Sequence, residues 1–179
     1  MNNDITEKNH RPEQASILDL PHENAISPIL QALALQCPEI TMIQLSWKEH
    51  ETCAWLPLLK NFPKLQELHL VGCFATVEDG QLGRFAPFRS LSPAFRRLSV
   101  LHVAYSCITD RCFVLMYKES RITALYLKAC HKITKAWLMT IPLHLPLLQK
   151  LTISNCALIF PENIEELRRI MPGLDIKYH

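Results

Sequence analysis

Apolar residues recur along the chain in one short phrase of three apolar positions, separated first by two variable residues and then by one. The phrase occurs as Ile40–Ile43–Leu45, Leu65–Leu68–Leu70, Leu98–Leu101–Val103, Ile122–Leu125–Leu127 and Leu148–Leu151–Ile153. A weaker copy, Ala15–Leu18–Leu20, precedes these, and a degenerate copy near Leu174–Ile176 follows them. Successive first positions are 25, 25, 33, 24 and 26 residues apart. A period in the twenties indicates stacked repeats, each too small to bury its own apolar face.

Each phrase is followed by apolar residues at helical spacing. These stripes fall within residues 29–35, 55–62, 113–117, 137–145 and 164–171. Their i, i+3, i+4 spacing predicts helices with one buried face. Prolines at 38, 63 and 172 follow three of these stripes, where a proline cannot continue the helix. Thr109, Asp110 and Thr134 precede other stripes and are expected to cap helix N-termini.

Strand, turn, helix and return together predict an α/β fold. Its form would be a leucine-rich repeat solenoid, a short right-handed horseshoe with a parallel sheet on the concave face and helices on the convex face. We expect one repeat domain over residues 15–179, with six to seven repeats, preceded by a mobile polar tail over residues 1–14. The second apolar position of the phrase is expected to form a buried ladder through Leu68, Leu101, Leu125 and Leu151.

The 33-residue interval places extra residues within 76–97. This stretch interleaves arginines with phenylalanines: Arg84, Arg89, Arg96 and Arg97 with Phe85, Phe88 and Phe95. One interpretation is a longer helix or an extra turn whose phenylalanines pack on the convex face. The other is a protruding loop that binds a partner, since arginine and aromatic residues are preferred interface anchors.

Composition and charge narrow the partners. A net charge of +2 over 179 residues argues against nucleic acid and anionic membranes as partners. No apolar stretch is long enough to span a membrane. The N-terminal segment has no apolar core of a signal peptide, and it contains acidic residues with a single arginine, Arg11. We therefore expect a cytoplasmic or nuclear protein that is not secreted through a cleaved signal peptide.

Cysteines occupy regular places in the repeat. They stand eight residues after the start of the phrase at Cys73, Cys130 and Cys156, with Ser106 in the equivalent position. Cys107-Ile108-Thr109-Asp110 and Cys130-His131-Lys132-Ile133-Thr134 continue two of the repeats, and Cys37-Pro38-Glu39-Ile40 leads into another. This pattern resembles the cysteine-containing subfamily of leucine-rich repeats. That subfamily includes the repeat region of F-box/LRR substrate receptors and F-box-free relatives such as the antagonist of mitotic exit network protein.

The resemblance covers residues 15–178, nearly the whole chain, and implies the solenoid fold with a role in recognising proteins. It also implies a narrower alternative, an adaptor that presents substrates to a ubiquitin ligase. Because only a short polar tail precedes the first phrase, we expect such an adaptor to lack an F-box. A bacterial effector that enters a eukaryotic cell is a further setting in which a compact repeat protein of this kind would act.

The seven cysteines are expected to be free thiols, mostly buried and structural. A thiol just after the strand points under the turn, where it can donate weakly to a loop carbonyl. We expect no cofactor and no metal site: Cys107 with Cys112, or His69 with His102, would supply only two ligands. No catalytic motif or phosphate-binding glycine loop occurs, so we expect no enzyme. The alternative from another class is an enzyme that uses a cysteine thiolate.

The variable positions of the strands carry the strongest functional signal. The position between the last two apolar residues should face the open side of the sheet, as should the position three residues further on. Equivalent residues of neighbouring strands lie about 4.8 Å apart. The expected aromatic and imidazole patch is Trp47, His69, His102, Tyr105 and Tyr126.

The patch suits a non-catalytic adaptor or recognition subunit, because exposed tyrosine and tryptophan are usual interface anchors. The expected partner is a protein, with no small-molecule substrate, and the chain is expected to be a monomer. An ordinary mixed polar face without a partner is the competing interpretation. A nucleic-acid reader that uses the arginines of residues 76–97 is a weaker alternative.

Overall fold

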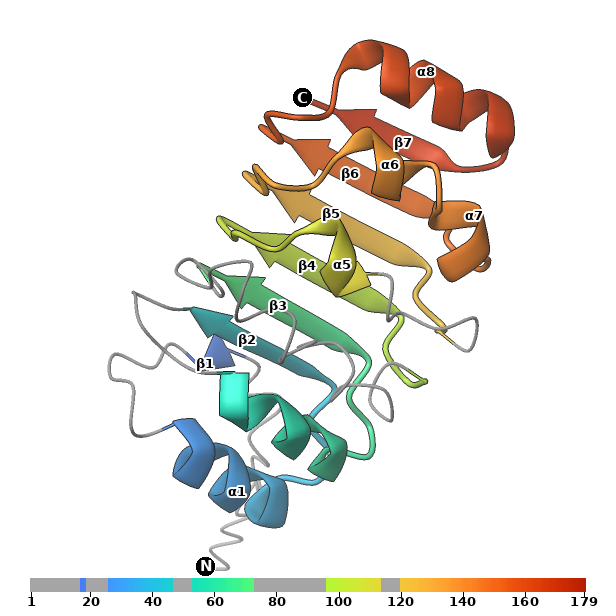
Figure 1. The fold of residues 1–179 in the computed structure, drawn as a ribbon. Helices are drawn as coiled ribbons and strands as arrows, with labels where there is room; N and C mark the ends of the chain where they lie inside the picture. Colours follow the sequence, from blue (N-terminus) through green and yellow to red (C-terminus); the bar gives the residue numbers. More distant parts are fainter. Residues whose placement is uncertain (1–16, 19–25, 47–52, 73–95, 114–119) are drawn as a thin grey trace, which may run out of the picture.

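Seven parallel strands form one sheet in the order of the sequence (Figure 1). The computed structural model describes residues 17–18, 26–46, 53–72, 96–113 and 120–179. The strands are β1 (Ile17–Leu18), β2 (Met42–Ser46), β3 (Glu67–Val71), β4 (Val100–Ala104), β5 (Ala124–Lys128), β6 (Lys150–Ser154) and β7 (Asp175–Tyr178). The polar tail predicted over residues 1–14 lies outside the described residues, and so do residues 76–95 of the predicted insertion.

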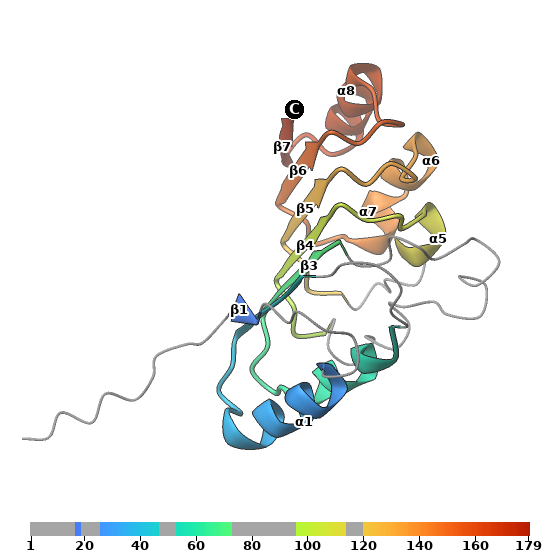
Figure 2. The same ribbon diagram turned by 90° about the vertical axis from the view of Figure 1, so that its left-hand side faces the viewer.

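The helices connect the strands and lie together on one side of the sheet (Figure 2). They are α1 (Ile26–Gln36), the 3-10 helix η2 (Cys53–Asn61), α5 (Asp110–Phe113), α6 (Lys135–Leu138), α7 (Ile141–His144) and α8 (Pro161–Ile170). The predicted α/β class with a parallel sheet and helices is therefore confirmed. Within the described part of the chain, no helix has the length and apolar character needed to cross a membrane.

The buried ladder predicted from the phrase is present. Leu68 pairs with Leu101, Leu101 with Leu125, and Leu125 with Leu151 across successive strands. All four side chains are fully buried. Because side chains alternate between the two faces of a strand, this register sends the intervening residues to the opposite face.

Proline lies inside two of the predicted helical stripes and changes both. The stripe of residues 137–145 forms two short helices, α6 and α7, with Pro142 in the first turn of α7. A continuous helix would require an N–H from Pro142 and would place its ring against the preceding turn, so the chain breaks and restarts. The stripe of residues 55–62 forms η2, a 3-10 helix with Pro57 inside it. The three prolines expected to follow helices do so, after α1, η2 and α8.

The capping predictions have different outcomes. Thr134 caps α6, because its hydroxyl accepts from the N–H of Ala136 at 3.1 Å. Asp110 instead binds the next repeat: its carboxylate accepts from the N–H of Thr134 at 2.8 Å and from the Thr134 hydroxyl at 2.5 Å. The cap predicted for Thr109 is wrong, since its hydroxyl oxygen is buried with no hydrogen-bond partner among the described residues.

The leucine ladder predicts a large effect of truncation at its middle. Leu125→Ala removes a fully buried side chain from β5 and should cost about 2–5 kcal/mol of unfolding free energy. For a chain of this length that lowers the melting temperature by about 4 °C or more. The matched control is Leu147→Ala, because Leu147 is 52% exposed and its loss should change little. Equal melting temperatures for the two variants would contradict this register of the core.

Candidate functional site

The side of the sheet away from the helices, here called the open face, carries a continuous column of side chains. Strand pairing places the column in register, with neighbours on adjacent strands, as Gln44, His69, His102, Tyr126, Thr152 and Lys177. The residues on either side of each column member in its own strand are core leucines, isoleucines or valines in β2 to β6. The apolar phrase alone is therefore enough to predict which residues of β2 to β6 form this column.

Three of the five predicted patch residues lie side by side in this column. The ring centroids of His69 and His102 are 5.0 Å apart, and those of His102 and Tyr126 are 5.8 Å apart. The rings meet at 68° and 56°, which are edge-on and tilted arrangements. Trp47, the first residue of the predicted patch, lies outside the described residues. The weak first copy, Ala15–Leu18–Leu20, aligns Leu18 with Ile43, but in the sheet Leu18 pairs with Leu45 and Ile17 with Gln44, so the register predicted for that copy is wrong.

Tyr105 is placed by an unusual backbone conformation at the end of β4. Its φ is 53°, in the left-handed region, and the equivalent residues after neighbouring strands share it: Gly72 at 70°, Ala129 at 51° and Asn155 at 53°. The N–H of Tyr105 donates to the carbonyl of Lys128 at 2.7 Å, which offsets the strain of a non-glycine residue in this region. The side chain of Tyr105 is 53% exposed.

Sequence reasoning did not find this left-handed position. Tyrosine and alanine rarely adopt it, so Tyr105 and Ala129 give no local signal. The available signal was the pair Gly72 and Asn155, the two residue types that tolerate left-handed backbone, at the equivalent place in their repeats.

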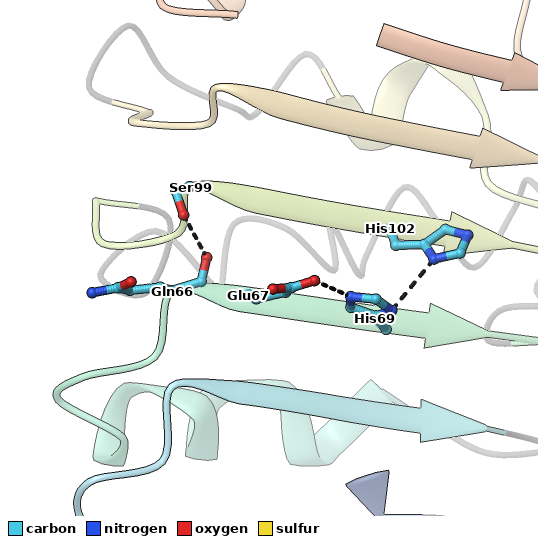
Figure 3. Close-up of polar contacts among 5 residues, drawn as sticks. All are labelled: Gln66, Glu67, His69, Ser99 and His102. Atoms are coloured by element: carbon cyan, nitrogen blue, oxygen red, sulfur yellow. Dashed lines mark hydrogen bonds and ion pairs between the residues drawn. The ribbon is translucent and has the colours of Figure 1, made fainter. Parts of the chain in front are cut away.

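A hydrogen-bonded chain runs across β3 and β4 on the open face (Figure 3). Glu67 Oε1 lies 2.6 Å from His69 Nε2, and His69 Nδ1 lies 3.4 Å from His102 Nδ1. An ionised carboxylate only accepts, so His69 Nε2 carries a hydrogen. One of the two Nδ1 atoms then donates and the other accepts, so the contact is lost if both imidazoles are protonated. Glu67 was not part of the predicted patch.

Burial is the main reason that His102 stays neutral. Burial lowers the pKa of His102 from its usual value near 6.5, and His69 and Lys128 lower it further, while Glu67 opposes them. Burial acts by withholding water from the charged form, and the two neighbours act by adding positive charge. At neutral pH His102 therefore presents an uncharged ring between His69 and Tyr126.

Two lysines lie over the tyrosines of the open face. Lys128 Nζ is 5.3 Å from the ring centroid of Tyr105, and Lys150 Nζ is 5.4 Å from that of Tyr126. Both distances are within the range of cation–π attraction. The predicted patch contained only aromatic and imidazole side chains and so left these lysines out. Their alternate positions in β5 and β6 nevertheless assign them to the open face.

The buried cysteines lie on the other side, beneath the turns. Cys130 Sγ donates to the carbonyl of Val103 at 3.5 Å and to that of Lys128 at 3.6 Å, so the thiol meets a carbonyl as predicted, but the acceptors lie in β4 and β5 and not in a loop. Cys156 Sγ makes the equivalent contact with Ser154 at 3.6 Å. The hydrogen bond with Cys156, together with burial, raises the pKa of Cys130, while the same bond lowers that of Cys156 to about 7. The pair therefore loses at most one proton near neutrality.

The remaining cysteines differ in exposure. Cys112 is buried like Cys130 and Cys156, Cys107 is half-buried, and Cys37 is exposed, so among the described cysteines the prediction of mostly buried thiols is confirmed, with Cys37 as the exception. All five are free thiols. Cys73 and the side chain of Cys53 lie outside what the structure describes. Among the described residues, no group of three or more His, Cys, Asp or Glu side chains could hold a metal ion.

The lowered pKa of His102 predicts a loss of stability in mild acid. As the pH falls through about 6.5, the unfolded chain takes up a proton at residue 102 before the folded protein does, which favours unfolding. The free energy of unfolding in urea, compared at about pH 7.5 and pH 5, should therefore fall less in His102→Gln than in wild type. His131→Gln, at an exposed histidine after β5, is the control. Identical pH dependence in wild type and His102→Gln would contradict this assignment.

Burial predicts the order in which the thiols react. In the folded protein iodoacetamide should modify Cys37 first. Cys130 and Cys156 should react at about one tenth of that rate or slower, whereas all three should react in denaturant. Mass spectrometry of peptides from a time course measures each rate. Fast modification of Cys156 in the folded protein would instead favour an enzyme with a cysteine thiolate, given its pKa of about 7.

Comparison with known proteins identifies no family or relative that shares this sequence. The chain matches no protein-family model. No curated protein matches it either. The function proposed below therefore depends on the placement of the open-face side chains and on the sequence pattern that puts them there.

Proposed function

We propose that the chain is a leucine-rich repeat solenoid of the cysteine-containing type, and that its open face binds a protein partner without catalysis. The observation that carries the proposal is the row of His69, His102 and Tyr126, together with Tyr105 just after the end of β4, where its ring contacts Lys128. None of these four side chains belongs to the buried core. Rings that the core does not need, gathered on one face, are the usual anchors of a protein interface.

The strands that carry these rings hold them in fixed positions, which supports binding. They stand on strands whose opposite faces are buried, so their backbone is already held before a partner arrives. Tyrosine and histidine have few rotatable bonds, and ordering them on binding costs little entropy. The contacts of His69 with Glu67 and His102 restrict two of the rings further. A partner would meet a preorganised surface rather than a set of mobile side chains.

We propose further that the protein acts as an adaptor or recognition subunit, as a monomer in the cytoplasm or nucleus. Free thiols at Cys37 and Cys107 are compatible with a reducing compartment. The narrower alternative, an F-box-free adaptor of a ubiquitin ligase, is supported by the sequence resemblance alone.

Site-directed cross-linking tests this function. A photoreactive phenylalanine at Tyr105 or Tyr126 should cross-link a protein in lysate, whereas the same group at Leu143, which is 54% exposed in α7, should not. The captured protein is then purified and titrated against variants. Tyr126→Ala and Tyr105→Ala should each weaken binding by about thirtyfold, as expected when an anchor worth about 2 kcal/mol is lost.

Two controls accompany this titration. Both tyrosine variants should keep the wild-type free energy of unfolding within about 1 kcal/mol, because neither side chain is in the core. Lys135→Ala, on α6 among the helices, should bind as wild type does. A purified partner that ignores both tyrosines, or that depends on Arg84, Phe88 or Arg89 instead, would show that the open face is not the binding site.

A further inference from the structure

The charges on the open face are distributed unevenly. Three lysines lie on its last three strands: Lys128 at the end of β5, Lys150 at the start of β6 and Lys177 in β7. Within the described residues, none of them forms an ion pair with a carboxylate. Lysines elsewhere do so, as with Lys64 to Glu39 and Lys135 to Glu166. The open face therefore keeps cations that its own acids do not neutralise.

The acids of this face are few and partly occupied. Glu67, on β3, is engaged with His69 at 2.6 Å. Asp175 pairs in register with Lys150 across β6 and β7, but the two side chains are not in ion-pair contact. Among the strand residues that the structure describes around Tyr126 and β6, the balance is three ammonium groups to one carboxylate. A positive field on an exposed surface favours a partner of opposite charge.

The three lysines surround one position, Thr152. Thr152 lies between Tyr126 on β5 and Lys177 on β7. Lys150 precedes it by two residues on the same strand, and Lys128 pairs with Ser154, two residues after it. The hydroxyl oxygen of Thr152 is itself buried and has no hydrogen-bond partner among the described residues, so the lysines and rings around it form the exposed surface. The spacing of strands and of residues along them places the backbone of Thr152 within about 10 Å of the backbone of each lysine.

We infer that the partner presents an acidic peptide segment to this part of the open face. This inference rests on the proposed function and adds the chemistry of the partner to it. Aspartate or glutamate side chains of the segment would pair with Lys128, Lys150 and Lys177, and an apolar side chain between them would lie on the rings of Tyr126 and Tyr105. The cation–π contacts hold two of the ammonium groups over the tyrosine rings, so acidic and apolar contacts fall close together.

A protein segment fits this surface better than a nucleic acid. Nucleic-acid sites neutralise a closely spaced row of phosphates and need a dense, mostly uninterrupted basic surface. Here three lysines are spread over three strands, and Glu67 and Asp175 share the face with them. The net charge of the whole chain is only +2. Sparse cations beside aromatic rings suit sparse carboxylates beside apolar side chains.

The test uses short random peptides displayed on phage and selected against the immobilised full-length protein at about 0.05 M NaCl. Selected sequences should be enriched in aspartate and glutamate. Synthetic copies should bind the triple variant Lys128→Gln/Lys150→Gln/Lys177→Gln about tenfold or more weakly, and wild type more weakly at about 0.3 M NaCl. The matched control Lys60→Gln/Lys132→Gln/Lys135→Gln removes the same charge from three exposed sites that are not on the strands of the open face. This control should bind the peptides as wild type does. Melting curves confirm that both variants fold.

The outcomes separate the two proposals. Peptides that require Tyr105 and Tyr126 but are neutral or basic, and that ignore the lysine variant, would overturn the acidic segment and leave the binding face standing. Peptides that ignore the tyrosines as well would overturn both. Failure to enrich any peptide on wild type over the lysine variant would also overturn the acidic segment. Displacement of an acidic peptide by a single-stranded oligothymidylate at equal concentration would assign the face to nucleic acid instead.

Discussion

The open face depends on the in-register burial of apolar side chains on the other face of the sheet. Leu68, Leu101, Leu125 and Leu151 pair strand to strand and are fully buried. Because side chains alternate, a slip of one residue in any strand would bury its polar residues and expose its leucines. That cost holds every strand in one register. His69, His102 and Tyr126 become neighbours as a consequence, although each is more than twenty residues from the next.

The ends of the strands show how the repeats are joined. The residue after each of four strands takes a left-handed conformation, and its N–H donates to the last residue of the next strand, or to His179 after β7. Just beyond, a buried thiol or hydroxyl at Cys130, Cys156 or Ser106 lies beneath the turn. Asp110 then bonds Thr134 in the following repeat. Each of these contacts joins one strand, or the segment that follows it, to the next along the sheet.

The two halves of the open face differ in how far their polar groups are already paired. On β3 and β4, Glu67 is hydrogen-bonded to His69 and His69 to His102, so these three side chains hold one another in place. On β5 to β7 the ammonium groups of Lys128 and Lys150 lie over tyrosine rings and form no ion pair with any carboxylate that the structure describes. The first half thus supplies rings held by hydrogen bonds beside one carboxylate, and the second half supplies ammonium groups. Affinity would come chiefly from the rings, whereas selection between partners would come from the lysines.

Sequence pattern alone determined the strands, their parallel order and their buried face, because the apolar period and the period-two alternation are local. It also placed His69, His102 and Tyr126 in one column, since equal positions in equal phrases must be neighbours. Only the tertiary structure decided the rest. The left-handed turn at Tyr105, the bond from Asp110 to Thr134 and the chain from Glu67 to His102 join residues across repeats. Whether a lysine meets a carboxylate or a tyrosine ring depends on side-chain directions in three dimensions, which no spacing along the chain encodes.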